Sequence, residues 1–185
     1  MYNLIKVFVV FLLLLYPVFI YYGIKYFSLS HLVVFLLVLF TVRVALIHKS
    51  SKTARYQVVF TVILGGVLVG LTWIFNSIVY LKWYPVGLNI VFFIVFVYSL
   101  IFPPSIIEQI ARVHRKDLPL SGIAYTRNVT IIWAAFFVTN AMISSWTVLY
   151  GTMEVWTLYN GLISYIIMGS LFLLEILLRK YFVEQ

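Results

Sequence analysis

Polar side chains recur inside two apolar stretches, and their spacing is that of a helix. The first stretch, residues 126–151, contains Thr130, Trp133, Asn140, Ser144 and Thr147. The second stretch, residues 155–178, contains Trp156, Asn160, Ser164 and Glu175. Both sets follow the three-and-four spacing that places side chains on one helix face. Polar groups in lipid need hydrogen-bond partners, so each set must face protein or a polar cavity.

A short turn between the two stretches makes them antiparallel neighbours. The resulting register places Asn140 opposite Ser164 and Ser144 opposite Asn160. These four residues and Thr130 are called the polar seam below. One role for the seam is helix packing, in which each interhelical hydrogen bond contributes about 0.6–2 kcal/mol. The other role is a polar lining for a ligand headgroup or an ion, because an asparagine in lipid often marks function.

Two charged residues also lie inside apolar stretches, near the ends that carry most basic residues. Arg43 can extend its guanidinium to the headgroups, and Glu175 can pair with Arg179 one helical turn later. Alternatively, Arg43 and Glu175 pair with each other. That buried polar spot would bind a phosphate or carboxylate headgroup.

The chain offers few groups for acid–base or metal chemistry. It has five acidic residues, three widely spaced histidines and no cysteine. Glu108 and Asp117 flank His114, but a charged amphipathic helix explains this cluster more simply. We therefore expect no catalytic residue, no metal and no cofactor, and the sequence favours a protein that is not an enzyme.

A basic cluster lies in the longest connection between apolar runs, residues 103–127. Its members are Arg112, Arg115, Lys116 and Arg127. On a helical projection the apolar residues Ile106, Ile107, Ile110, Ala111 and Val113 occupy the opposite arc. The pattern predicts a short amphipathic helix, capped by Ser105, that lies on the inner leaflet. Its basic face would hold an anionic partner, either lipid or an acidic carrier protein.

The composition is that of an integral membrane protein. Of 185 residues, 64% are hydrophobic and 10% are charged, whereas soluble domains have about 25% charged residues. Mean hydropathy is +1.10. Six runs are long enough to span a membrane, at residues 5–26, 29–48, 57–80, 84–102, 128–150 and 155–178. We expect a single all-α membrane domain of six transmembrane helices. Gly66 and Gly70 form a G-x-x-x-G, which favours packing within the bundle over a dedicated dimer motif.

The basic residues predict the orientation of this bundle. With six spans, eleven of the thirteen basic residues lie on one side, and only Lys25 and Lys82 lie on the other. The positive-inside rule places the richer side in the cytoplasm, together with both termini. The first run is longer than a signal-peptide core and has no cleavage site after it, so we expect a retained helix. The net charge of +8 thus reflects topology, and no nucleic-acid partner is expected.

The second half of the chain resembles a known group of proteins. The residues that carry the resemblance are Pro103, Pro104, Tyr125, Thr126, Arg127, Val129, Thr130, Trp133, Phe136, Phe137, Asn140, Trp156, Asn160, Gly161, Tyr165, Gly169 and Glu175. They are similar to an uncharacterised family of small bacterial inner-membrane proteins encoded beside fatty-acid-synthase-like enzymes, in clusters for aryl polyene or xanthomonadin-type lipids. Trp133, Phe136 and Phe137 also give a weaker likeness to the intracellular septation protein A family.

The resemblance implies a pathway more than a reaction. It implies a multi-pass protein of a bacterial inner membrane that serves as a non-catalytic accessory in making or moving an aryl-polyene or fatty-acyl lipid. An acyl-carrier protein or a ketosynthase-type enzyme would then dock at the basic cluster. Two alternatives stay open: a small transporter or flippase that uses the polar seam, and a membrane-embedded acyl- or glycosyltransferase. The oligomeric state is also open.

Overall fold

The computed structural model describes residues 15–45, 52–114 and 117–183, and every regular element in these ranges is helical. The predicted all-α class is therefore confirmed. Three stretches in the described ranges are long and apolar enough to cross a membrane. They are Val79–Ile101, Leu120–Tyr150 and Met153–Arg179. Two shorter apolar segments, Leu29–Val42 and Val62–Phe75, accompany them.

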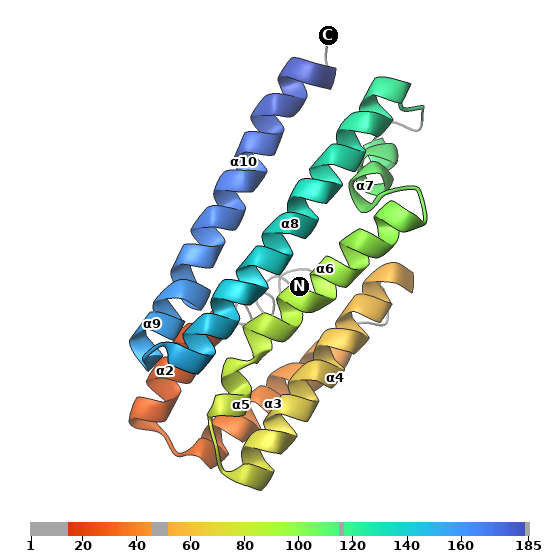
Figure 1. Ribbon diagram of the computed structural model, residues 1–185. Coiled ribbons are helices and arrows are strands. Elements are labelled where there is room, and N and C mark those ends of the chain that lie inside the picture. Colours follow the sequence, from red (N-terminus) through yellow and green to blue (C-terminus); the bar gives the residue numbers. More distant parts are fainter. Residues whose placement is uncertain (1–14, 46–51, 115–116, 184–185) are drawn as a thin grey trace. The chain divides into compact units, whose positions relative to one another are not determined.

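Figure 1 shows the order of the helices along the chain. They are α2 (Tyr16–Tyr26), α3 (Leu29–Ala45), α4 (Lys52–Phe75), α5 (Val79–Lys82), α6 (Tyr84–Ile101), α7 (Ile106–His114), α8 (Leu120–Tyr150), α9 (Met153–Leu158) and α10 (Ser164–Val183). A π-helical turn, Tyr159–Ile163, joins α9 to α10. Prolines lie where a helix tolerates them: Pro17 and Pro85 are in first turns, and Pro119 directly precedes α8.

Two predicted boundaries differ from the structure for local reasons. The run predicted to continue to residue 80 ends as a helix at Phe75, because Asn76 adopts a left-handed backbone with φ of 46°. Asparagine tolerates this conformation and often ends helices. The helix predicted from residue 128 begins already at Leu120. Its first two turns are polar enough to lower hydropathy, yet nothing in them breaks a helix.

The chain packs as two compact units. The first unit comprises Met1–Gly87 and Ser144–Leu162. In it α3 packs against α4 and α2, α4 against α5, and α2 against α9. Its fully buried side chains include Ile20, Leu36, Leu81 and Trp156.

Glycines allow close helix contacts in the first unit, but not where the sequence predicted them. Gly66 and Gly70 have no atom within 4 Å of a Cβ built on them among the described residues, so their predicted packing contact is not formed within this part of the chain, and the alternative dimer contact stays a prediction. The close approach uses Gly65, where a Cβ would meet the ring of Phe40. A helix turns 100° per residue, so Gly65 and Gly66 face different directions.

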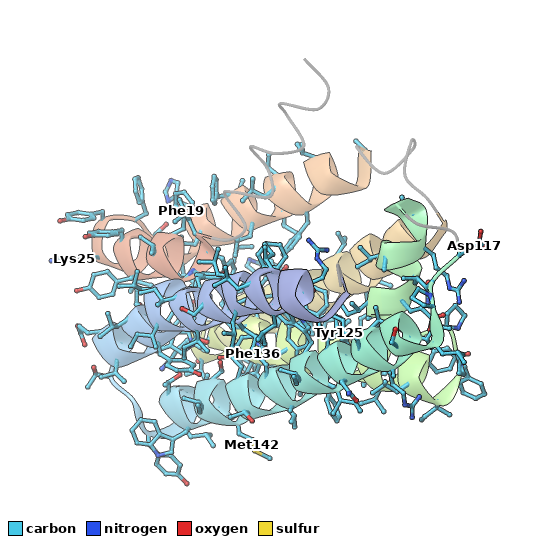
Figure 2. The ribbon with its side chains drawn as sticks, turned by 90° about the horizontal axis from the view of Figure 1, so that it is seen from above. Phe19, Lys25, Asp117, Tyr125, Phe136 and Met142 are labelled. Carbon is cyan, nitrogen blue, oxygen red and sulfur yellow. The ribbon has the colours of Figure 1, made fainter. Side chains whose placement is uncertain are left out.

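The second unit comprises Leu88–Ile143 and Ile163–Gln185. Its core is aromatic: Phe92 and Phe96 from α6 pack on Phe137 from α8, with ring centroids 5.1 Å apart in both pairs. Figure 2 shows Phe136 among the helices and Met142 pointing outward from α8. The outward-facing thioether is 67% exposed, as expected of a lipid-facing position.

The amphipathic helix α7 belongs to the second unit. Ile106 and Ile107 pack against the aromatic core, while Val113 is 80% exposed. The backbone N–H of Ile106 donates to Ser99 Oγ at 3.0 Å, which caps the helix from α6. Ser105 occupies the predicted position directly before the helix, and its carbonyl accepts from the backbone N–H of Gln109 at 2.9 Å. Its hydroxyl, however, is buried and has no hydrogen-bond partner among the described residues, so it does not cap the helix.

Exposed apolar side chains cover the outer surfaces of both units. In Met153–Arg179 only 6% of the most apolar window is buried by protein. An apolar surface of this extent is costly in water and is the expected surface toward lipid. Aromatic residues lie at the helix ends of the first unit, where Trp73 at the end of α4 is 70% exposed and Tyr150 at the end of α8 is 76% exposed. Such residues typically lie at the membrane–water interface.

Candidate functional site

One half of the polar seam forms a closed hydrogen-bond network in the first unit. Ser144 Oγ donates to Asn160 Oδ1 at 2.7 Å, as the predicted register requires. The amide of Asn160 donates to Thr147 Oγ1 at 3.2 Å and to the carbonyl of Trp156 at 2.9 Å. All four side chains are buried. The network satisfies the polar groups internally, which is the behaviour of a packing contact.

Asn160 lies in the π-helical turn, and the sequence analysis did not predict this turn. A π turn shifts backbone bonding from i+4 to i+5, and the side-chain amide of Asn160 reaches the Trp156 carbonyl four residues earlier. Gly161 in the same turn lets α2 approach closely, since a Cβ there would lie 3.3 Å from Val18 Cγ2. The sequence feature that could have indicated an irregular turn here is the pair Asn160-Gly161 inside an apolar helix.

The other half of the polar seam belongs to the second unit. Asn140 Nδ2 donates to Asn89 Oδ1 of α6 at 3.0 Å. Asn89 was not among the predicted site residues, although an asparagine inside the apolar run 84–102 is an unusual residue there. The predicted contact of Asn140 with Ser164 stays a prediction, as does any role for the seam in ligand binding. Thr130 is fully buried and donates to the carbonyl of Thr126 at 2.7 Å, within α8.

A second group of buried polar contacts surrounds Lys82 in the first unit. Lys82 is 8% exposed, and its Nζ lies 3.5 Å from the carbonyl oxygen of Val148. The indole Nε1 of Trp156 donates to the carbonyl of Lys82 at 3.1 Å, and Tyr16 donates to the carbonyl of Leu81 at 2.8 Å. These bonds hold α5 between the beginning of α2 and the end of the α8–α9 hairpin. Lys82 falls between the predicted spans 57–80 and 84–102, and the structure buries it there.

The predicted basic face is partly occupied by contacts within the protein. Arg112 forms an ion pair with the buried Glu108, with 2.7 Å between Nη2 and Oε1. Arg127 Nη1 donates to the carbonyl of Leu100 at 3.1 Å, where it meets the end of α6. Arg115 and Lys116 lie outside the described residues. Arg112 and Arg127 therefore both bind groups of the second unit, a carboxylate and a backbone carbonyl. The role of the basic cluster in docking a partner stays a prediction.

The proposed pair of Arg43 and Glu175 stays a prediction, because the side chain of Arg43 lies outside the described part of the structure. Glu175 is half-buried. No ion pair within 4.0 Å joins it to a basic side chain that the structure describes, so the expected pair with Arg179 is not formed. Instead, Glu175 lines a cleft.

This cleft lies between α8 and the second half of α10, within the second unit. Its volume is about 330 Å³, near the lower end of the usual range for small-molecule sites. Tyr125, Asn128 and Glu175 line one end of it, and Ile132, Trp133 and Leu171 line the walls one turn further on. We call it the lateral cleft.

The two sides of the lateral cleft are joined at its polar end. The hydroxyl of Tyr125 donates to the backbone carbonyl of Glu175 at 3.2 Å, and Figure 2 shows Tyr125 between the two helices. The apolar walls remain open to the outside, since Ile132 is 50% exposed and Leu174 is 53% exposed. A cleft with a polar end, apolar walls and a lateral opening matches the polarity of an amphiphile.

A further hollow lies in the first unit, with a volume of about 490 Å³. Its lining is largely aromatic, including Phe19, Tyr22 and Phe35, and it contains no acidic, lysine or arginine side chain. His31 at its edge is hydrogen-bonded to Ser28. This hollow therefore lacks the polar end that distinguishes the lateral cleft.

The described residues form a helical protein with three stretches that are long and apolar enough to cross a membrane. No family model, curated protein or solved structure matches the chain. The resemblance to the aryl-polyene-associated family and the likeness to the septation protein A family therefore stay predictions. A functional assignment has to rest on the geometry of the sites.

Proposed function

We propose that the protein is a non-catalytic accessory of a bacterial inner membrane that binds an acyl lipid in the lateral cleft and serves the biosynthesis or transport of such a lipid. The single observation that carries this proposal is the cleft itself. Tyr125, Asn128 and Glu175 supply a polar end, and Ile132, Trp133 and Leu171 supply an apolar wall of about one helical turn.

The lateral cleft opens on the apolar outer surface of the second unit, where Ile132 and Leu174 are exposed. Glu175 lies inside the predicted span 155–178, where a carboxylate is costly unless polar groups reach it. The hydroxyl of Tyr125 hydrogen-bonds to its side chain, and a bound headgroup would add the opposite charge that a hydroxyl does not carry. A lipid supplies both parts, because its headgroup can meet the polar end while its acyl chain covers the leucines of α10. The hydrogen bonds of the polar seam already account for its asparagines, so the cleft and not the seam is the candidate binding site.

The wider proposal keeps six spans, a multi-pass arrangement and both termini in the cytoplasm. It is supported by the distribution of basic residues and by the three apolar helical stretches that are long enough to span. The polar end of the cleft would then face the cytoplasmic leaflet, on the same side as the basic cluster. An acidic acyl-carrier protein, or a ketosynthase-type enzyme, docked at that cluster could exchange acyl groups with lipid near the cleft.

Lipid retention by the purified protein tests the binding step. Ile132→Trp fills the apolar wall, and Ile131→Trp adds the same ring at a neighbouring position that does not line the cleft. Native mass spectrometry after detergent extraction should show bound phospholipid on the wild type and on Ile131→Trp, and several-fold less on Ile132→Trp. Equal retention by both variants would contradict the proposal.

Docking of the carrier protein is tested separately. Charge reversal of Arg115 and Lys116 to Glu, with Lys49 and Lys52 kept to preserve topology, should reduce capture of an acyl-carrier protein at low salt. Arg112 is left unchanged because reversing it would place a second acid beside Glu108. Undiminished capture, with normal lipid product in cells, would leave the cluster as a topological anchor only.

A further inference from the structure

We infer that the lateral cleft selects lipids whose headgroup carries a primary ammonium group, and that Glu175 binds this group. The inference rests on the proposed lipid binding in the cleft and adds the chemical class of the lipid. Its starting point is that an acid lies at the polar end of the cleft and that no basic side chain is among the lining residues.

The charge of Glu175 determines which headgroups fit. A carboxylate in apolar surroundings is stabilised by an opposite charge and by hydrogen bonds, and it repels a phosphate. No described basic side chain forms an ion pair with Glu175. The hydroxyl of Tyr125 donates to the backbone carbonyl of Glu175 and also hydrogen-bonds to its side chain, but it supplies no positive charge. An ammonium group supplies both the charge and three hydrogen-bond donors.

The next charged residue along α10 explains how a zwitterion is accommodated. Arg179 is exposed and lies one helical turn beyond Glu175, toward the predicted cytoplasmic surface. An aminophospholipid carries an ammonium group and a phosphate a few bonds apart. Its ammonium group can reach Glu175 while its phosphate contacts Arg179 at the surface, so the two side chains complement the two charges of one headgroup.

Related headgroups fail one of these contacts. Phosphatidylcholine has the positive charge, but its trimethylammonium group donates no hydrogen bond. Phosphatidylglycerol has hydroxyl donors but a net negative charge, which Glu175 repels. Phosphatidylethanolamine is therefore the probe of choice. We expect it to be retained about tenfold more than either of the others, the ratio given by one charge-assisted hydrogen bond.

The experiment reconstitutes the full chain in nanodiscs with equal amounts of these three phospholipids and measures retained lipid by native mass spectrometry. Glu175→Gln keeps the shape of the side chain and should abolish the preference while leaving total retention similar. Glu154→Gln removes an exposed acid outside the cleft and should leave the preference unchanged. Arg179→Gln should lower retention of all three phospholipids and leave the preference among them unchanged, because each of them carries the phosphate.

The outcomes separate the two proposals. If Ile132→Trp retains as much lipid as the wild type, the proposed binding function fails. If Ile132→Trp loses lipid but Glu175→Gln keeps the wild-type preference, the headgroup inference alone fails. A wild-type preference for phosphatidylglycerol, or none at all, also overturns the inference.

Discussion

Asn140 on α8 donates a hydrogen bond from its side-chain amide to the side-chain carbonyl of Asn89 on α6, with 3.0 Å between Nδ2 and Oδ1. The bond links two long apolar helices that are far apart in the sequence. It lies close to the stacked rings of Phe92 and Phe137 along the same two helices. In hydrocarbon this amide pair fixes the register of α6 against α8, because a slip of either helix would break the hydrogen bond between the two side chains.

Replacing Asn140 by Leu should therefore destabilise the second unit by about 0.6–2 kcal/mol. Asn89→Leu should cost a similar amount, and the double variant should cost less than the sum. A double-mutant cycle of unfolding in mixed detergent micelles measures this coupling. Strict additivity would show that the two amides do not stabilise each other.

Asn160→Leu should cost more than Ser144→Ala. The first change leaves the hydroxyls of Ser144 and Thr147 and the carbonyl of Trp156 without the amide, whereas the second removes one donor. Each unsatisfied buried group costs about 1–3 kcal/mol. The same unfolding assay compares both variants with Ser170→Ala, which alters an exposed hydroxyl. A ranking with Ser144→Ala as the most harmful change would contradict the central position of Asn160 in the network.

Gly161→Val and Gly169→Val form a matched pair on one continuous helical segment. A Cβ at Gly161 would lie 3.3 Å from Val18 Cγ2, whereas Gly169 has no described atom within 4 Å. Overpacking at the first site should cost about 1–3 kcal/mol, and the second change should be nearly neutral. Thermal unfolding of the purified variants measures the difference. Equal loss at both positions would mean that α2 does not approach the π turn.

Lys25 and Lys82 should differ in reactivity toward a membrane-impermeant amine reagent. Both are predicted on the outer side, but Lys25 is exposed beside the ring of Tyr26, whereas Lys82 is 8% exposed. Peptide mapping after labelling of intact cells should find Lys25 modified and Lys82 protected until the protein is unfolded. Rapid labelling of Lys82 in the folded protein would contradict its burial.

Reporter fusions test the orientation. A fusion after Gln185 should be active only with a cytoplasmic reporter, and an insertion within residues 151–154 only with a periplasmic one, because the basic residues favour the cytoplasmic side. A periplasmic C-terminus would overturn the six-span arrangement.

Local patterns in the sequence predicted part of this structure. The contact between Ser144 and Asn160 followed from helical spacing and a short turn, since an antiparallel hairpin leaves almost no freedom of register. Asn89 was missed because it lies on α6, which does not follow or precede α8 directly through a short turn. Which helix packs beside Asn140 depends on the tertiary arrangement, and spacing along one helix does not determine it. The early end of α4 was missed because the apolar run continues past Asn76, whereas the helix ends at Phe75 before the left-handed backbone of Asn76.

The candidate site was less accessible to sequence reasoning than the fold. Glu175 was recognised as an unusual residue, but its expected partner was Arg179 or Arg43. The cleft depends on the separation of α8 from α10 and on side chains such as Ile132 and Leu174, which are unremarkable in an apolar helix. Ordinary residues form its walls, so only the three-dimensional arrangement identifies them.

The π turn at Tyr159–Ile163 also determines where this chain can change its length. A π turn holds about one residue more than an α turn, so it absorbs an extra residue locally. Removing one residue there would give a regular helix, and Ser164 and Glu175 would keep the faces that they now occupy. The loss of one residue from the regular helix between Ser164 and Glu175 would instead rotate everything after it by about 100°. Related chains should therefore differ in length at the π turn and keep the spacing between Ser164 and Glu175.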